Sequence, residues 1–208
     1  MQSTINTMKP ILLTLVTLAT IQLATAQERL PREEALKYAA AVTADTRQLA
    51  GAPIATDPDA KQPVALREGE YGGLVLPQKN LSAESLKPTQ AQSVAPVGLL
   101  WLHNLAPMKY GQAIAPDKLR LVTVYADGGY ATVPQCALGV RQTSDGGLEL
   151  LVFGKSAEPL LSVPLRSITS TQELPIELAA EREYDSGRIT GKILGKYQAT
   201  FAVTELIL

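Results

Sequence analysis

The amino-acid sequence predicts a mainly β protein, an antiparallel β-sandwich or barrel-like domain preceded by one N-terminal helix and a linker. The first indication is the stretch Leu119 to Leu165, where short apolar, β-branched runs are separated by Asp127-Gly128-Gly129 and Asp145-Gly146-Gly147. Aspartate and glycine both tolerate the left-handed backbone of a tight hairpin, so this stretch is expected to form a β-meander that ends with a fourth strand. An α+β domain, with the helix packed on a sheet, is the alternative.

The second indication is the C-terminal hairpin, where apolar and polar residues alternate on both sides of Leu194-Gly195-Lys196. A three-residue loop at this point places Ile193 opposite Tyr197 and Ile189 opposite Phe201, all on one face. A two-residue loop would turn the two apolar faces in opposite directions. The alternation therefore predicts the three-residue loop.

Residues 1–26 have the features of a signal peptide. Lys9 precedes an apolar run from Ile11 to Leu23, and Ala24-Thr25-Ala26 supplies the small residues that a signal peptidase reads. The run is too short for a comfortable membrane span of about 20 residues, and no second run of this kind follows. We therefore expect an exported protein, periplasmic or extracellular, that begins at Gln27 and has no transmembrane segment in the mature chain.

Residues 27–66 are predicted to form a helix and a proline-containing linker, and residues 67–208 the β-domain. The helix is expected from about Pro31 to Ala50, with proline in the first turn and Gly51 as a stop. Its apolar face is rich in alanine and thin, so weak docking is expected. Further along, the pattern predicts a strand at 71–76, a short capped helix at 82–86, a strand buried on both faces at 97–102, and a short edge strand at 174–178.

Charge and cysteine content exclude some classes of function. The chain has 19 basic and 20 acidic residues, which are interspersed along it, and Lys9 is the only charged residue before Gln27. A nucleic-acid partner usually requires a concentration of basic side chains, so no nucleic-acid binding is expected. Cys136, the single cysteine, cannot form an intramolecular disulfide and is expected to be an inert, buried thiol in a strand.

Two groups of side chains are candidates for a functional site. Trp101 and His103, the only tryptophan and histidine, point to one side of a strand because side-chain direction repeats every second residue. With Tyr110 on the loop beyond, they are a candidate binding surface. The alternative places Trp101 in the core and His103 at its edge.

The second group is acidic: Glu181, Glu183 and Asp185, in what reads as a polar connection. Glycoside hydrolysis requires paired carboxylates, although spacing in the sequence does not show that they face each other. No catalytic, metal or cofactor motif is present, and one histidine cannot make a histidine-rich metal site.

The sequence therefore favours an exported, non-catalytic β-domain that acts as a binding or structural module of the cell envelope or exterior, with a protein or glycan partner. Two alternatives remain open. One is a glycan hydrolase that uses the loop carboxylates. The other is a subunit of a larger envelope assembly, whose contact is the alanine-rich helix or the apolar C-terminus Leu206-Ile207-Leu208.

Overall fold

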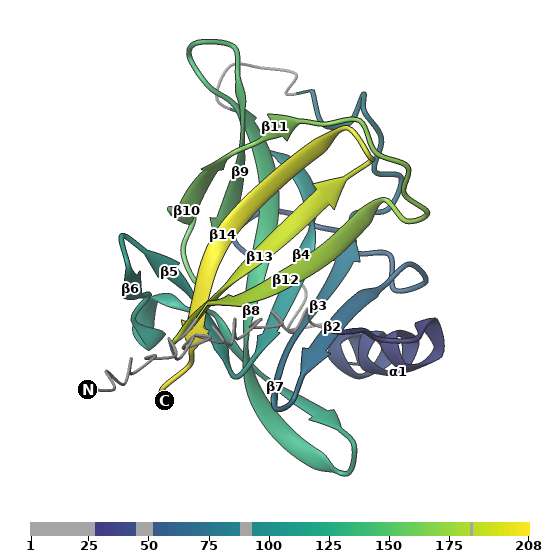
Figure 1. Cartoon of the computed structure of the whole chain (residues 1–208), viewed down its shortest axis with the longest axis vertical. Helices are drawn as coiled ribbons and strands as arrows, with labels where there is room; N and C mark the ends of the chain where they lie inside the picture. Colours follow the sequence, from purple (N-terminus) through teal and green to yellow (C-terminus); the bar gives the residue numbers. More distant parts are fainter. Residues whose placement is uncertain (1–27, 45–51, 88–92, 184) are drawn as a thin grey trace, which may run out of the picture.

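The computed structural model describes residues 28–44, 52–87, 93–183 and 185–208, which form two packed antiparallel sheets and one α-helix (Figure 1). The eight-stranded first sheet contains, in spatial order, β1 (Glu28–Arg29), β2 (Val64–Glu68), β3 (Tyr71–Pro77), β4 (Ala95–His103), β8 (Gly129–Gln142), β9 (Leu148–Phe153) and β10 (Pro159–Pro164), with β7 (Leu121–Ala126) paired to β8. The six-stranded second sheet contains β12 (Ile176–Glu183), β13 (Ser186–Ile193), β14 (Tyr197–Glu205), β5 (Leu105–Lys109) and β6 (Gln112–Ala113), with β11 (Arg166–Ser167) paired to β14. A 3₁₀ turn, η1 (Pro116–Lys118), precedes β7. The predicted mainly β fold with an N-terminal helix is confirmed.

The predicted meander is formed by β7, β8, β9 and β10. Its first turn is a two-residue loop, in which Asp127 and Gly128 have φ angles of 51° and 81°. These positive angles are those that the turn of a tight hairpin requires. In the second turn Gly146 has a φ of 83°. Pro134 is the last residue paired with β7 and Gln135 the first paired with β4, so the proline lies where β8 changes partners.

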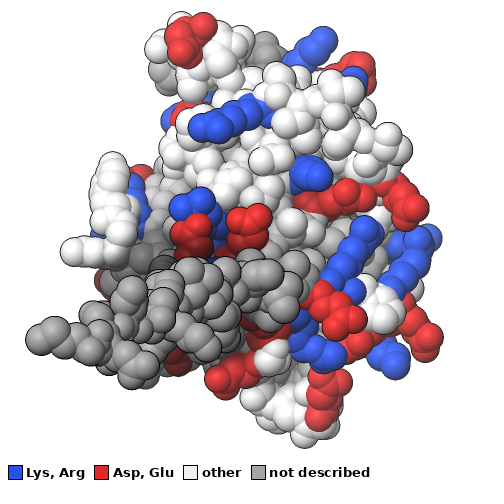
Figure 2. Space-filling model, in the orientation of Figure 1, with Lys and Arg blue, Asp and Glu red and all other residues white. Residues whose placement is uncertain are grey.

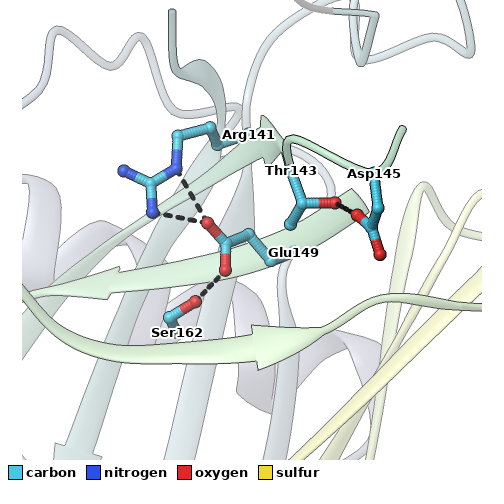
Figure 3. Close-up of polar contacts among 5 residues, drawn as sticks. All are labelled: Arg141, Thr143, Asp145, Glu149 and Ser162. Atoms are coloured by element: carbon cyan, nitrogen blue, oxygen red, sulfur yellow. Dashed lines mark hydrogen bonds and ion pairs between the residues drawn. The ribbon is translucent and has the colours of Figure 1, made fainter. Parts of the chain in front are cut away.

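Polar side chains tie the later strands of the meander together (Figure 3). Arg141 Nε on β8 donates to Glu149 Oε1 on β9 at 2.8 Å, and the Ser162 hydroxyl on β10 donates to Glu149 Oε2. Burial raises the pKa of Glu149, but the bonds from Ser162 and Arg141 outweigh it and hold the pKa below its usual value. In the turn, the Thr143 hydroxyl donates to Asp145 and lowers the pKa of that carboxyl.

The first sheet buries both of its faces. Its inner face packs against the second sheet, and Leu100 and Leu102 of β4 belong to this core. Its outer face forms a second apolar cluster, to which Leu99 and Trp101 of the same strand contribute. The prediction that residues 97–102 are buried on both faces is confirmed. Cys136 is buried in the inner core, and this burial raises its pKa to about 12.

The helix α1 (Arg32–Thr43) covers part of the outer face of the first sheet (Figure 1). Its contacting side chains are Ala35, Ala39 and Val42, which are buried in the outer cluster. The Thr43 hydroxyl donates to the Ala39 carbonyl at 2.7 Å in the last turn. Residues 45–50 of the predicted helix lie outside the described part of the chain.

The C-terminal hairpin has the predicted register. Ile193 pairs with Tyr197 and Ile189 with Phe201, around the loop Leu194-Gly195-Lys196. Leu194 and Gly195 both have positive φ angles, of 56° and 64°. The short helix predicted at 82–86 is wrong: this segment is a turn, in which the Leu86 N–H donates to the Ser82 carbonyl at 3.2 Å. Pro88 lies outside the described residues.

Candidate binding cleft

A cleft of about 400 Å³ opens on the outer face of the first sheet, and we call it the outer cleft. It lies between α1, the β2–β3 turn, the end of β4 and the β7–β8 hairpin, which Figure 1 shows extending beyond the body of the sandwich. Its wall is mainly apolar. Side chains of five elements and of the segment before α1 contribute to that wall: Leu30, Val42, Leu74, Trp101, Val124 and Val133.

Glycines widen the outer cleft along β3. Gly72 and Gly73 line it, and Gly72 lies opposite His103 in the register of β3 and β4. A Cβ atom at Gly72 would stand 3.7 Å from the His103 Cβ and 3.2 Å from the Leu66 carbonyl oxygen. The absence of a side chain at Gly72, which faces the same side of the sheet as His103, therefore keeps space free in front of the sheet.

Trp101 is the most informative residue of the outer cleft. It lies on β4 between Leu74 on β3 and Gln135 on β8 in the strand register, and only 3% of it is exposed. Its indole Nε1 is buried, and no described residue is its hydrogen-bond partner. Buried polar groups are nearly always paired, because an unpaired donor loses its bond to water without compensation. Trp101 thus holds an unused donor in the wall of a cleft.

Gln135 adds two further unpaired atoms beside Trp101. It is 1% exposed, and in the part of the chain that the structure describes neither its Oε1 nor its Nε2 has a hydrogen-bond partner. Its side chain faces the outer cluster, since Val133 and Ala137, two residues away on either side, both belong to that cluster. An unpaired indole N–H and an unpaired amide therefore lie side by side on neighbouring strands.

A chain of polar side chains runs along the rim of the outer cleft. Arg67 on β2 forms an ion pair with Glu34 on α1 at 2.9 Å, and its Nη1 donates to the Tyr38 hydroxyl at 3.5 Å. The Tyr38 hydroxyl in turn donates to Asp127 Oδ2 at 2.7 Å. This hydrogen bond is the main reason that the pKa of Tyr38 is raised, with burial adding to it. The helix, the sheet and the tip of the hairpin are thereby connected.

The structure brings Trp101 and His103 to the same cleft, with His103 exposed at its edge. Tyr110 lies elsewhere. It has a φ of 54° in the β5–β6 turn, is 94% exposed, and lines a groove beside β14. The binding role of these three residues stays a prediction.

The acidic group lies on the second sheet. The prediction of a polar connection is wrong for Glu181 and Glu183, which belong to β12, and Asp185 lies in the turn that follows. Glu183 forms an ion pair with Arg188 at 3.0 Å, and Glu181 lies opposite the same arginine in the strand register. Glu181 and Asp185 line a separate hollow of about 490 Å³. The carboxylates thus share their surroundings with a basic side chain.

Sequence reasoning missed Tyr38 and Asp127 as members of the outer cleft, and Gln135 as the buried neighbour of Trp101. The sequence predicts Asp127 in a turn and Tyr38 in a helix, and neither pattern indicates that the two side chains meet. Gln135 did carry a signal: it is the one polar residue between Pro134 and Gly139 in an otherwise apolar stretch. A lone amide in a buried strand is costly unless it is paired or serves a site.

No protein-family model, curated protein or solved structure matches the chain. Among the described residues, no helix is long and apolar enough to cross a membrane, and no three acidic, histidine or cysteine side chains gather into a possible metal site. Basic and acidic side chains are intermixed on the face shown in Figure 2.

Proposed function

We propose that the protein is an exported, non-catalytic binding module, and that the outer cleft holds its ligand. The ligand is a compact molecule with an apolar body and a hydrogen-bond acceptor. The observation that carries this proposal is the unpaired, buried Nε1 of Trp101 in the wall of an apolar cleft. Ligand sites are typically concave and apolar, with a few polar groups that fix orientation.

The physical basis of binding would be the removal of apolar surface from water together with one directed bond. The cleft volume of about 400 Å³ is in the range of small-molecule sites. An acceptor on the ligand would satisfy the Trp101 donor, and the apolar wall would cover the rest of the ligand. The hydrogen bond between Tyr38 and Asp127 stabilises the position of the hairpin over this site.

Trp101 makes the proposal directly testable, because it is the only tryptophan of the chain. Purified protein should be titrated with a panel of small aromatic amides and ketones while tryptophan emission and heat are recorded. We expect saturable binding that changes the emission. Trp101→Phe, which removes the donor and keeps an aromatic ring, should weaken binding measured by calorimetry about tenfold, as the loss of one hydrogen bond does.

A matched pair of variants separates the cleft from the rest of the surface. Ala131 lines the outer cleft, whereas the next residue, Thr132, faces the other side of the hairpin. Ala131→Phe fills the cleft and should abolish binding, and Thr132→Phe should leave it unchanged. Binding that survives Ala131→Phe, or a panel without any saturable ligand, would refute the assignment.

Export is tested separately. Mass spectrometry of protein recovered outside the cytoplasm should give a chain that begins at Gln27. Retention of residues 1–26 in that protein would contradict the proposed signal peptide, which lies outside the described residues.

The hydrolase alternative is tested with polysaccharide substrates. The ion pair between Glu183 and Arg188 favours a structural role for that carboxylate. Any turnover that is lost on Glu181→Gln or Glu183→Gln would overturn the non-catalytic proposal.

A further inference from the structure

The second sheet contains a gap on one side of β14. On its other side, β14 pairs with β13 over nearly its full length. On the gap side, β11 pairs only with Tyr197 and Gln198, and β5 pairs only with Val203, Thr204 and Glu205. Within the described residues, the stretch 199–202 therefore has no strand partner on this side.

Hydrogen bonds at both ends of β14 fix the direction of the backbone groups in the gap. The Lys196 carbonyl accepts from the Ile168 N–H at 2.8 Å, and the Leu206 N–H donates to the Asn104 carbonyl at 3.0 Å. Backbone groups of alternate residues in a strand point to the same side. The N–H and C=O groups of the even-numbered residues between them, Thr200 and Ala202, therefore point into the gap.

The opposite wall of the gap is the edge strand β10. Among the described strands it pairs only with β9, and the Leu165 N–H donates to the Leu148 carbonyl at 2.8 Å. By the same alternation, Ser162 directs its backbone groups away from β9, towards the free edge. Between the two walls lies a groove of about 540 Å³, which we call the strand groove. The chain passes directly from β10 through Leu165 to β11 and so joins the walls at one end.

The side chains of the strand groove divide into an apolar inner side and a polar outer side. Phe201 and Leu161 line it and belong to the core between the sheets, with 8% and 6% exposure. Thr200, on the outer side, is exposed and contacts Thr190 through their hydroxyl groups. Tyr110 stands at the rim with its ring almost fully exposed. A strand placed here would turn alternate side chains to the core and to solvent.

We propose that the strand groove binds an extended peptide segment of a partner protein, which adds a strand beside β14. Along β14 the unpaired N–H and C=O groups recur at every second residue. An extended peptide backbone matches them, because it too presents an N–H donor and a C=O acceptor at every second residue on one side. An apolar side chain of the peptide packs beside Phe201 and Leu161, and Tyr110 covers the peptide from the rim. This site is separate from the outer cleft and does not depend on a ligand there.

The first test is hydrogen exchange of individual amides, measured by NMR on the free protein at low concentration. The amide of Phe201 points towards β13 and should be protected, whereas the amides of Thr200 and Ala202 should exchange quickly. Equal protection of all three would overturn the proposal, since it would show that the gap is already filled. Protection that rises with protein concentration alone would show that a second copy occupies the groove, and would overturn it as well.

The second test uses peptides. A displayed library of random octapeptides is selected on the protein, and the selected sequences are synthesised with N-methyl groups on alternate residues in either of two phases. One phase should abolish binding and the other retain it, because only every second peptide N–H faces β14. The retained peptide should protect the amides of Thr200 and Ala202. Ala202→Pro, which removes one donor at the open edge, should weaken binding about tenfold.

The N-methyl comparison leaves the protein unchanged, so it remains decisive if Ala202→Pro disturbs the sheet. Equal binding by both methylated phases would mean that side chains alone are recognised, and would refute strand addition. A library that yields no peptide able to protect these amides would refute it too.

Discussion

Replacing the buried Gln135 by leucine is expected to stabilise the protein. Both polar atoms of the Gln135 side chain are buried without a hydrogen-bond partner among the described residues. Each unpaired buried group costs about 1–3 kcal/mol, and a buried leucine side chain gains about 1.5–3 kcal/mol over an exposed one. Repacking of the neighbouring side chains around the branched leucine costs up to about 1.5 kcal/mol of this gain. Since two such groups are removed, we expect Gln135→Leu to raise the free energy of unfolding by about 2 kcal/mol or more.

Urea unfolding followed by far-UV circular dichroism measures this change, and the slope of the transition should stay the same as in the wild type. Leu99→Gln is the reciprocal control, because Leu99 is fully buried in the same outer cluster. It adds an unpaired amide and should lower the free energy of unfolding by about 3 kcal/mol or more. If Gln135→Leu instead costs more than about 1 kcal/mol, the amide has a partner such as an internal water, and the reasoning is wrong.

Three further predictions concern other parts of the fold. The pKa of about 12 makes the Cys136 thiolate about a thousandfold scarcer than it would be at the ordinary pKa of 9.0. A thiol reagent should therefore label the protein only after denaturation, and rapid labelling of the native protein would contradict this. A Cβ at Gly98 would stand 2.3 Å from the Leu76 carbonyl oxygen, so Gly98→Ala should lower the free energy of unfolding by about 2–4 kcal/mol. At the control position Gly73 the nearest atom to a Cβ is 4.0 Å away, so Gly73→Ala should change the free energy of unfolding by less than about 1 kcal/mol. Similar losses for the two variants would show that the strands can separate. The pKa of Glu149 is lower in the folded than in the unfolded protein, so its contribution to stability is present above the unfolded pKa and is lost as pH falls through the folded pKa. When the free energy of unfolding is measured from neutral pH to about pH 3, Glu149→Gln should therefore lose less stability towards acid pH than the wild type. An unchanged loss towards acid pH would refute this.

Strand pairing could be predicted from the sequence wherever one face is apolar and the other polar. The register at Leu194-Gly195-Lys196 follows from a period of two, because a shift by one residue would expose Ile189 and Phe201. The same period places Trp101 and His103 on one side of β4.

The sequence predicts an edge strand at 174–178, whereas β12 runs from Ile176 to Glu183, because the second half of β12 carries too little apolar signal. From Glu181 to Glu183 all three residues are exposed, so no burial pattern separates strand from loop there. The backbone pairing with β13 decides the structure instead. Ser82 to Leu86 shows the reverse case: a hydrogen bond from the Ser85 N–H to the Ser82 hydroxyl gives the start of a helix, but too few residues follow to continue it.

The outer cleft and the strand groove could not be predicted because each depends on pairing between distant parts of the chain. The outer cleft requires α1 to dock beside the β7–β8 hairpin, and the alanine face of α1 does not indicate where it docks. The strand groove requires β11 and β5 to pair with opposite ends of β14 and to leave residues 199–202 between them without a partner. Neither arrangement has a local signature.

The hydrogen bond from Tyr38 to Asp127 joins residues that are 89 positions apart in the chain. Contacts between such distant residues form slowly, because a long loop must close before the contact gains any energy. The α-helix can form early and locally, but its docking site includes β7 from the middle of the chain together with β2 and β3. During folding, the buried side of the helix is therefore exposed until the middle of the chain has paired, and this is the interval in which the protein is most open to aggregation.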